Sequence, residues 1–198
     1  MSEPGVLVAI LAAGASRRLG RPKQLVPIAG QPLLRRQCGV ALSARIGPVL
    51  AILGCDADRY ARVIADLPVE IRVNDEWQEG MAASLRRAVG VAIERRAALL
   101  VLACDQYRIT PDDLRSLHDA WRRAPSSACV SRWDAYAGPP AIMPVECHDE
   151  VRQLRGDRGA RAVLFDPRRP RPIEVANRHA AYDLDSPQDV AVAQSSTW

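Results

Sequence analysis

Short apolar runs rich in Val, Ile and Leu recur along this chain, separated by longer stretches whose apolar residues fall at helical spacing. The runs that we expect to form strands are Val6–Leu11, Val49–Leu53, Val69–Val73, Leu99–Ala103 and Ala128–Ser131. Between the third and fourth runs, one helical face carries Met81, Leu85, Ala88, Val89, Ala92 and Ile93. A second helix is expected to start at Thr110, whose hydroxyl can cap it and which Pro111 follows. Strands that alternate with helices are typical of an α/β fold, so we predict a three-layer α/β/α domain with a mostly parallel sheet.

Length and composition fit a single domain over residues 1–198. The chain is 48% hydrophobic and 25% charged, which excludes a disordered chain and supplies enough apolar side chains for a substantial core. The five cysteines show no C-x-x-C spacing, so neither a disulfide framework nor a zinc site is expected. The apolar run from Val6 to Ala13 is too short to cross a bilayer, and no basic residue precedes it. We therefore expect a cytoplasmic protein with no membrane partner.

The first quarter of the chain is strongly cationic. No Asp or Glu occurs from Pro4 to Cys55, whereas seven basic residues give this segment a formal charge of +7, namely Arg17, Arg18, Arg21, Lys23, Arg35, Arg36 and Arg45. Lys23 is the sole lysine beside 26 arginines. An ammonium is a compact point charge and a guanidinium a planar fork, so this isolated lysine behind a glycine-containing turn indicates chemistry rather than solubility. Composition alone fits a nucleic-acid-binding surface or an arginine-rich solvated face as well as a small polyanion, and the glycine turn favours nucleotide phosphates.

Three polar segments follow predicted strands. They are the turn after Leu11, the stretch that begins at Asn74, and Cys104-Asp105-Gln106. Ligands of open α/β sheets bind beyond the carboxyl ends of the strands. We therefore expect these segments, although far apart in sequence, to line one cleft.

The turn after the first predicted strand has residue types that hold phosphates. Gly14 and Gly20 would let backbone N–H groups approach phosphate oxygens, Ser16 adds a hydroxyl, and Arg18 and Lys23 add charge. The familiar phosphate loops do not fit, because Gly20 is followed by Arg-Pro-Lys and the acid that a dinucleotide fingerprint needs is missing. A nucleotide would therefore be held in another way.

The segment from Leu11 to Lys23 reads Leu-Ala-Ala-Gly-x-Ser-x-Arg-x-Gly-x-x-Lys and resembles the signature of the nucleotidyltransferases that attach a nucleotide to molybdopterin. Five further motifs of that family follow in order, namely Asn74-x-x-Trp77-x-x-Gly80-Met81-x-x-Ser84-Leu85, Cys104-Asp105-Gln106, Gly138-x-Pro140, Gly156-Asp157-x-Gly159-Ala160-Arg161 and Asp183-x-Asp185-x-Pro187-x-Asp189. The alanine at position 13 resembles the cytidylyl branch, since the guanylyl branch typically has Leu-Ala-Gly-Gly here. The chain departs from the family pattern at Leu19, Tyr107 and Arg158, where Met, Pro and Lys are common.

This resemblance implies a Rossmann-like fold of the nucleotide-diphospho-sugar transferase type. It implies transfer of CMP from CTP to the terminal phosphate of molybdopterin, with release of pyrophosphate and with Mg²⁺ as cofactor. Residues 1–105 would bind the nucleotide and residues 106–198 the acceptor. A molybdoenzyme would receive the product, and no nucleic acid is expected as a partner.

The resemblance also implies roles for individual residues. The nucleotide-binding residues would be Leu11, Ala12, Ala13, Gly14, Ser16, Arg18, Lys23, Asn74, Gly80 and Ser84. The acceptor-binding residues would be Gln106, Gly138 and Pro140. Lys23, Arg18 and Asp105 would be catalytic, with Lys23 neutralising charge on the transferred phosphate, and Asp105 and Asp185 would bind Mg²⁺.

Several assignments keep an alternative. Asp105 also fits a turn cap, and Asp185 also fits the N-cap of the last helix, with Asp183 or Asp189 as the metal ligand instead. Asn74 either contacts the base or ribose or closes a turn. For the whole chain, the alternatives are an enzyme that uses GTP, a transferase for another phosphorylated acceptor, and a non-catalytic carrier of the cofactor.

Overall fold

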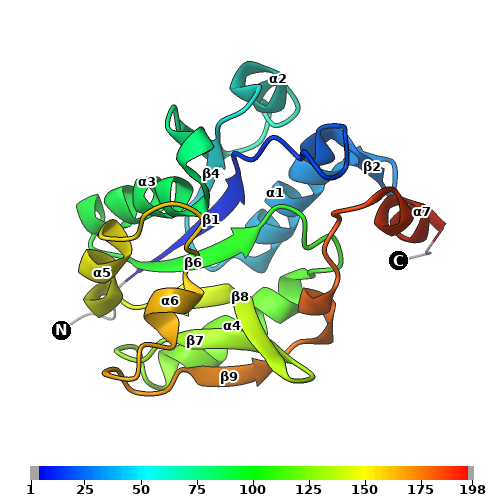
Figure 1. The fold of residues 1–198 in the computed structure, drawn as a ribbon. Coiled ribbons are helices and arrows are strands. Elements are labelled where there is room, and N and C mark those ends of the chain that lie inside the picture. Colours follow the sequence, from blue (N-terminus) through cyan, green and yellow to red (C-terminus); the bar gives the residue numbers. More distant parts are fainter. Residues whose placement is uncertain (1–4, 196–198) are drawn as a thin grey trace.

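A seven-stranded sheet runs through the centre of the computed structural model, which describes residues 5–195 (Figure 1). Its spatial order is β5-β4-β1-β6-β8-β7-β9. The strands are β1 (Val6–Ala12), β4 (Val49–Leu53), β5 (Val69–Val73), β6 (Ala98–Ala103), β7 (Cys129–Trp133), β8 (Tyr136–Met143) and β9 (Ile173–Ala176). β1 is parallel to β4 and β6, β4 to β5 and β7 to β9, whereas β8 is antiparallel to β6 and β7. The prediction of an α/β fold with a mostly parallel sheet is confirmed.

All five predicted strands occur, with ends displaced by no more than two residues. β8 and β9 were not predicted from the sequence. β8 contains Pro139 and Pro140, and proline within a strand removes a donor from the ladder. The structure accommodates both prolines where the register between β7 and β8 shifts, so the pairing does not need their missing N–H groups.

Helices cover both faces of the sheet (Figure 1). They are α1 (Leu33–Ala44), α2 (Ala57–Arg62), α3 (Met81–Glu94), α4 (Pro111–Arg122), α5 (His148–Arg152), α6 (Arg161–Leu164) and α7 (Pro187–Ser195). Short 3-10 turns occur at η1 (Lys23–Leu25), η2 (Trp77–Glu79), η3 (Val145–Cys147) and η4 (Arg178–Ala181), and β2 (Pro27–Ile28) pairs with β3 (Gln31–Pro32). Thr110 caps α4 as predicted, in a capping box with Asp113. Within residues 5–195, no helix has the length and apolar character needed to cross a membrane.

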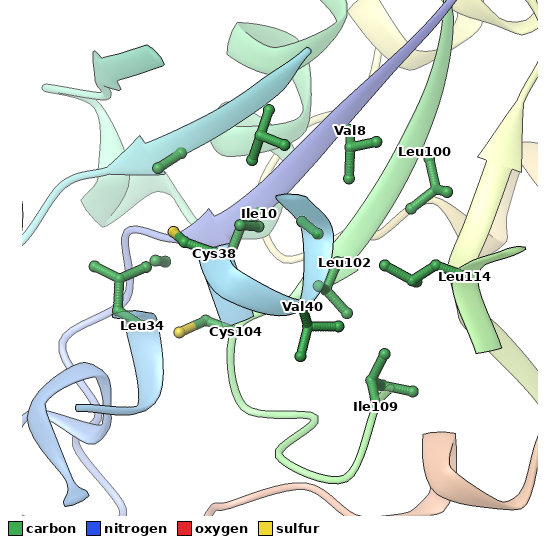
Figure 2. Packing of buried hydrophobic residues seen from close by; sticks show 14 of the residues in the cluster. Val8, Ile10, Leu34, Cys38, Val40, Leu100, Leu102, Cys104, Ile109 and Leu114 are labelled. Carbon is green, nitrogen blue, oxygen red and sulfur yellow. The ribbon is translucent and has the colours of Figure 1, made fainter. Parts of the chain in front are cut away.

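The core has two halves, one on each face of the sheet, because successive residues of a strand point to opposite faces. On one face, the side chains of β1 and β6 pack with α1 and the segment before α4, as Figure 2 shows for Val8, Ile10, Leu34, Cys38, Leu100, Leu102 and Ile109. On the other face, Leu7 and Ala9 belong to the core that α3, α5 and α6 complete. Both faces of the central strands are buried, which explains their continuous apolar runs.

The predicted apolar face of α3 is largely confirmed. Leu85, Ala88, Val89 and Ala92 are fully buried against the sheet. Met81 and Ile93, at the two ends of this face, are 52% and 37% exposed. Met81 lines the cleft described below, which leaves its side chain partly open to solvent.

Candidate active site

A cleft of about 470 Å³ opens beyond the carboxyl ends of β1 and β6, where the chain first runs to one side of β1 and then returns to the other. This is the place where open α/β sheets bind their ligands, and the volume lies within the range of small-molecule sites. The predicted site residues that line it are Leu11, Ala12, Ala13, Gly14, Ser16, Arg18, Lys23, Gly80, Ser84, Asp105 and Asp185. The expected convergence of distant segments on one cleft is confirmed.

A cluster of four charged side chains lies in this cleft. Lys23 Nζ donates to Asp105 Oδ2 at 2.7 Å and to Asp185 Oδ1 at 2.8 Å. Arg18 forms an ion pair with the other oxygen of Asp185 at 2.9 Å, and its side chain is 80% exposed. The carboxylates of Asp105 and Asp185 therefore face one common position, as expected for two groups that share a ligand.

Backbone contacts bring the two aspartates together although 80 residues separate them. The N–H of Leu184 donates to the carbonyl oxygen of Asp105 at 3.0 Å. Gln106 and Asp183 form an isolated antiparallel bridge beside this bond. The segment before α7 is thus paired with the segment after β6, which places Asp185 opposite Asp105.

The charges of the cluster determine its protonation. Burial alone lowers the pKa of Lys23, but the charges of Asp105 and Asp185 and their hydrogen bonds outweigh burial and raise it above its ordinary value. The ammonium is therefore charged at neutral pH. Partial burial and the charges of Asp105 and Asp185 raise the pKa of Asp183 to about 6, so this region resists a third negative charge.

The loop after β1 is held from beneath by Gln24, a residue that was not predicted from the sequence. Gln24 is buried, and its Nε2 donates to the carbonyl oxygens of Ala12 at 3.0 Å and Gly14 at 2.8 Å. Ser16 adopts a positive φ of 55°, and its Oγ accepts a hydrogen bond from the N–H of Lys23 and donates to Gln24 Oε1. The Ser16 hydroxyl therefore closes the loop and sets the position of Lys23. The sequence offered one indication that Gln24 is buried, which is that its amide side chain directly precedes an apolar run.

Asn74 lies buried at the end of β5 and outside the cleft lining, as far as residues 5–195 define it. Its Oδ1 accepts from the N–H of Glu76, and its Nδ2 donates to Ser84 Oγ at 3.1 Å. Of the two roles considered for Asn74, the structure shows the closing of a turn by its side chain. Through Ser84 the same side chain also ties this turn to the wall of the cleft.

Hydrogen bonds connect Glu79 and the first turns of α3 to the segment around Gly156. Arg86 forms two hydrogen bonds with Glu79, at 2.7 and 2.5 Å, and a third with the carbonyl oxygen of Leu154. The N–H of Gly156 donates to Glu79, and its carbonyl oxygen accepts from Ala82. The hydrogen bonds from Arg86 and the Gly156 amide lower the pKa of Glu79 to about 2, so the Glu79 carboxylate is ionised at neutral pH.

Gly80 has to be glycine at this contact. Its φ is +121°, and an added Cβ would lie 2.4 Å from Asp157 Oδ1 and 2.7 Å from the Gly156 carbonyl oxygen. We expect Gly80→Ala to lower the free energy of unfolding by about 1 to 3 kcal/mol, as measured by urea denaturation, and to weaken nucleotide binding.

The matched control is Gly90→Ala on the same helix. Nothing lies within 4 Å of an added Cβ at Gly90, and alanine favours a helix interior by about 0.5 to 1 kcal/mol. Equal stability of the two variants would contradict the close approach at Gly80.

The three predicted acceptor-binding residues lie beside the cleft and are absent from its lining within residues 5–195. Gln106 is buried, and its Nε2 donates to the carbonyl oxygens of Pro139 and Ala180. Gly138 and Pro140 flank Pro139 on β8, and Pro139 itself lines the cleft. Gln106 thus positions the strand beside the cleft, and its role toward an acceptor stays a prediction.

Two carboxylates are available for a divalent cation. Within residues 5–195, no group of three Asp, Glu, His or Cys side chains is arranged around one metal position. Mg²⁺ is commonly held by one or two carboxylates together with substrate phosphates. Asp105 and Asp185 therefore fit a cation that arrives with a nucleotide, and they are the residues that would hold it.

Asp189 has a different task in the structure. Its Oδ2 accepts hydrogen bonds from the N–H groups of Asp185 and Ser186 and from Ser186 Oγ, which forms a capping box at the start of α7. We expect Asp189→Ala to lower the free energy of unfolding by about 1 kcal/mol while divalent-cation binding by the folded protein persists. Urea denaturation and Mn²⁺ titration check this, and a variant of normal stability that binds no cation would make Asp189 a ligand instead.

Cys104 lies beside the cluster without being reactive. Burial and the charge of Asp105 raise the pKa of its thiol well above the ordinary value. A buried neutral thiol is a poor nucleophile.

Comparison with known proteins identifies a family that matches most of the chain. Residues 8–172 match the MobA-like NTP transferase domain. A molybdenum cofactor guanylyltransferase of Rhodobacter capsulatus is 33% identical, with 93% of each chain covered. The purine catabolism protein PucB of Bacillus subtilis is 26% identical, with 96% of each chain covered.

A solved structure with a closely similar fold is that of Rv0371c from Mycobacterium tuberculosis. It superposes with a TM-score of 0.86 at 27% identity and covers 99% of this chain and 100% of its own. A structure of Rv0371C in complex with manganese superposes with a TM-score of 0.78 at 25% identity, covering 98% and 100%.

Proposed function

This chain belongs to the MobA-like NTP transferase family, and on that premise we propose that it transfers CMP from CTP to the terminal phosphate of molybdopterin. The observation that carries the proposal is the cluster of Lys23, Asp105 and Asp185 at the mouth of a nucleotide-sized cleft. Residues 1–105 supply most of the nucleotide side and residues 106–198 the acceptor side. The product would pass to a molybdoenzyme in the cytoplasm.

In the proposed reaction, an oxygen of the acceptor phosphate attacks the α-phosphorus of the triphosphate. A bond forms between that oxygen and the α-phosphorus, the bond from the α-phosphorus to the bridging oxygen breaks, and pyrophosphate leaves. No protein nucleophile is needed, so the chain contributes mainly orientation and charge. Lys23 would neutralise charge on the transferred phosphate, and Arg18 would bind the triphosphate at the exposed edge of the cleft.

A divalent cation, with Mg²⁺ as our choice, would supply Lewis-acid charge to the phosphates when Asp105 and Asp185 hold it. The similarity to Rv0371C, which has a structure in complex with manganese, supports a divalent cation without selecting one. Mg²⁺ and Mn²⁺ are therefore compared in the assay below.

Different observations favour different bases. The alanine at position 13, which lines the cleft, resembles the cytidylyl branch and favours CTP. The similarity to a guanylyltransferase at 33% identity favours GTP as the second candidate. A comparison of transfer from CTP with transfer from GTP therefore tests the proposed specificity for CTP.

The experiment follows label from α-³²P-labelled CTP, GTP, UTP and ATP onto purified molybdopterin, with Mg²⁺ or Mn²⁺. We expect the greatest transfer from CTP, and transfer lower by at least about a hundredfold with Asp105→Asn as the matched control. Greater transfer from GTP would establish the second candidate. Parallel reactions offer a sugar phosphate or an alcohol phosphate in place of molybdopterin, and label on one of these alone would identify another acceptor. Molybdopterin binding without transfer from any nucleotide would contradict the enzyme and favour a carrier.

A further inference from the structure

Lys23 occupies the place that a cation shared by Asp105 and Asp185 would occupy. Its Nζ lies 2.7 Å from Asp105 Oδ2 and 2.8 Å from Asp185 Oδ1, and its side chain is only 16% exposed. A divalent cation held by both carboxylates needs oxygens at about 2.0 to 2.1 Å, directed at one centre. An ammonium hydrogen-bonded to the same two groups stands in the way of that arrangement, and like charges at this separation repel.

The carboxylates of the cluster already have positive partners. Asp105 and Asp185 carry two negative charges, and Lys23 and Arg18 carry two positive ones, with Asp183 as a further carboxylate nearby. A free divalent cation therefore has to displace an ammonium from the oxygens that it needs. A cation that arrives with a nucleoside triphosphate brings negative charge with it, and the displaced ammonium gains phosphate oxygens as new partners.

The side chain of Lys23 can move while its backbone stays in place. The N–H of Lys23 donates to Ser16 Oγ at 3.0 Å, and the residue begins the short turn η1. A flexible four-carbon stem separates this anchor from the ammonium, whose three donors rotate and so change partners readily. The same loop lines the cleft on the side where a triphosphate would lie.

We propose that Lys23 is a displaceable counter-ion, which holds Asp105 and Asp185 together until a divalent cation takes these carboxylates and the ammonium turns to the triphosphate. Lys23 and the metal thus compete for the same oxygens, and tight metal binding is deferred until nucleotide arrives. The inference rests on the proposed function for the triphosphate step. The competition itself is a property of the three side chains, and its tests therefore use metal alone.

The first test is Mn²⁺ binding without nucleotide, followed by the loss of the free Mn²⁺ signal in electron paramagnetic resonance. We expect Lys23→Met to bind Mn²⁺ at least about tenfold more tightly than the wild type, because the carboxylates lose a competing cation. Arg21→Met is the matched control, since it removes one positive charge from the same loop and is expected to change affinity much less. The double variant Lys23→Met, Asp105→Asn should lose the gain.

Equal or weaker Mn²⁺ binding by Lys23→Met would overturn the proposal, since Lys23 would then merely organise the carboxylates. An equal gain in Arg21→Met would overturn it too, because the effect would belong to the net charge of the loop. Circular dichroism on each variant confirms that folded protein is compared.

The second test leaves the protein unaltered and uses the fact that Lys23 is its sole lysine. Protein labelled with [ε-¹³C]lysine gives one side-chain signal in a two-dimensional NMR spectrum. We expect this signal to move on Mg²⁺ titration, with the same midpoint at which Mg²⁺ displaces Mn²⁺ from the site. A stationary signal at saturating Mg²⁺ would overturn the exchange. The titration requires no nucleotide transfer, so failure of the proposed function is distinguished from failure of this inference.

Discussion

Replacing Lys23 with methionine is expected to lower turnover by about a hundredfold to a thousandfold, the usual cost of removing one preorganised electrostatic contact to a transition state. The ammonium is fully charged and largely buried between two carboxylates, so nothing else in the cluster supplies its charge at that position. Steady-state kinetics with labelled CTP measure the effect. Because metal affinity rises in this variant on our inference, a loss of turnover at saturating Mg²⁺ belongs to the missing charge.

Lys23→Arg separates charge from shape. The guanidinium keeps the charge but is a planar fork, which does not fit a site where one nitrogen meets two carboxylates at 2.7 and 2.8 Å. We expect turnover to fall by at least about tenfold, roughly 1.4 kcal/mol of transition-state stabilisation. The control is Arg21→Lys, the reverse exchange at an exposed position of the same loop. Wild-type turnover in Lys23→Arg would refute the requirement for a point charge.

Asp105→Asn and Asp185→Asn should each reduce turnover by at least about a hundredfold, because an amide is a weak ligand for a hard cation and leaves the Lys23 charge uncompensated. The backbone of Asp105 is held by bonds from Tyr107 and Leu184 to its carbonyl oxygen, so the asparagine keeps the position. Rate measurements at increasing Mg²⁺ and Mn²⁺ report whether the loss is one of metal binding.

Asp183→Asn is the matched control for these two variants. This substitution removes the negative charge of a carboxylate in the same segment as Asp185. Burial and the charges of Asp105 and Asp185 raise the pKa of Asp183 to about 6, so its ionised form is already disfavoured there. We expect its turnover to stay within a few-fold of the wild type. A larger loss in Asp183→Asn than in Asp185→Asn would move the metal site to Asp183.

The features that were predicted correctly depend on residues that lie close together in the sequence. The apolar run of β1 and the capping of α4 by Thr110 are of this kind, so the sequence alone indicates them. β8 could not be recognised in this way, because only its place in the register between β6 and β7 makes Pro139 and Pro140 acceptable. Gln24 was missed for a similar reason, since a buried amide has meaning only beside the carbonyl groups that it bonds.

By itself the sequence determined the strand–helix alternation, the acid-free segment around a lone lysine, and the order of motifs that indicates a nucleotidyltransferase. These properties are carried by short stretches and need no knowledge of distant contacts. Only the tertiary structure decided that Asp185 rather than Asp189 joins Asp105, that Asn74 closes a turn, and that Lys23 lies between both carboxylates. The reason is physical: the pairing of Leu184 with Asp105 and the capping of α7 by Asp189 are hydrogen bonds whose partners the folded chain alone brings together.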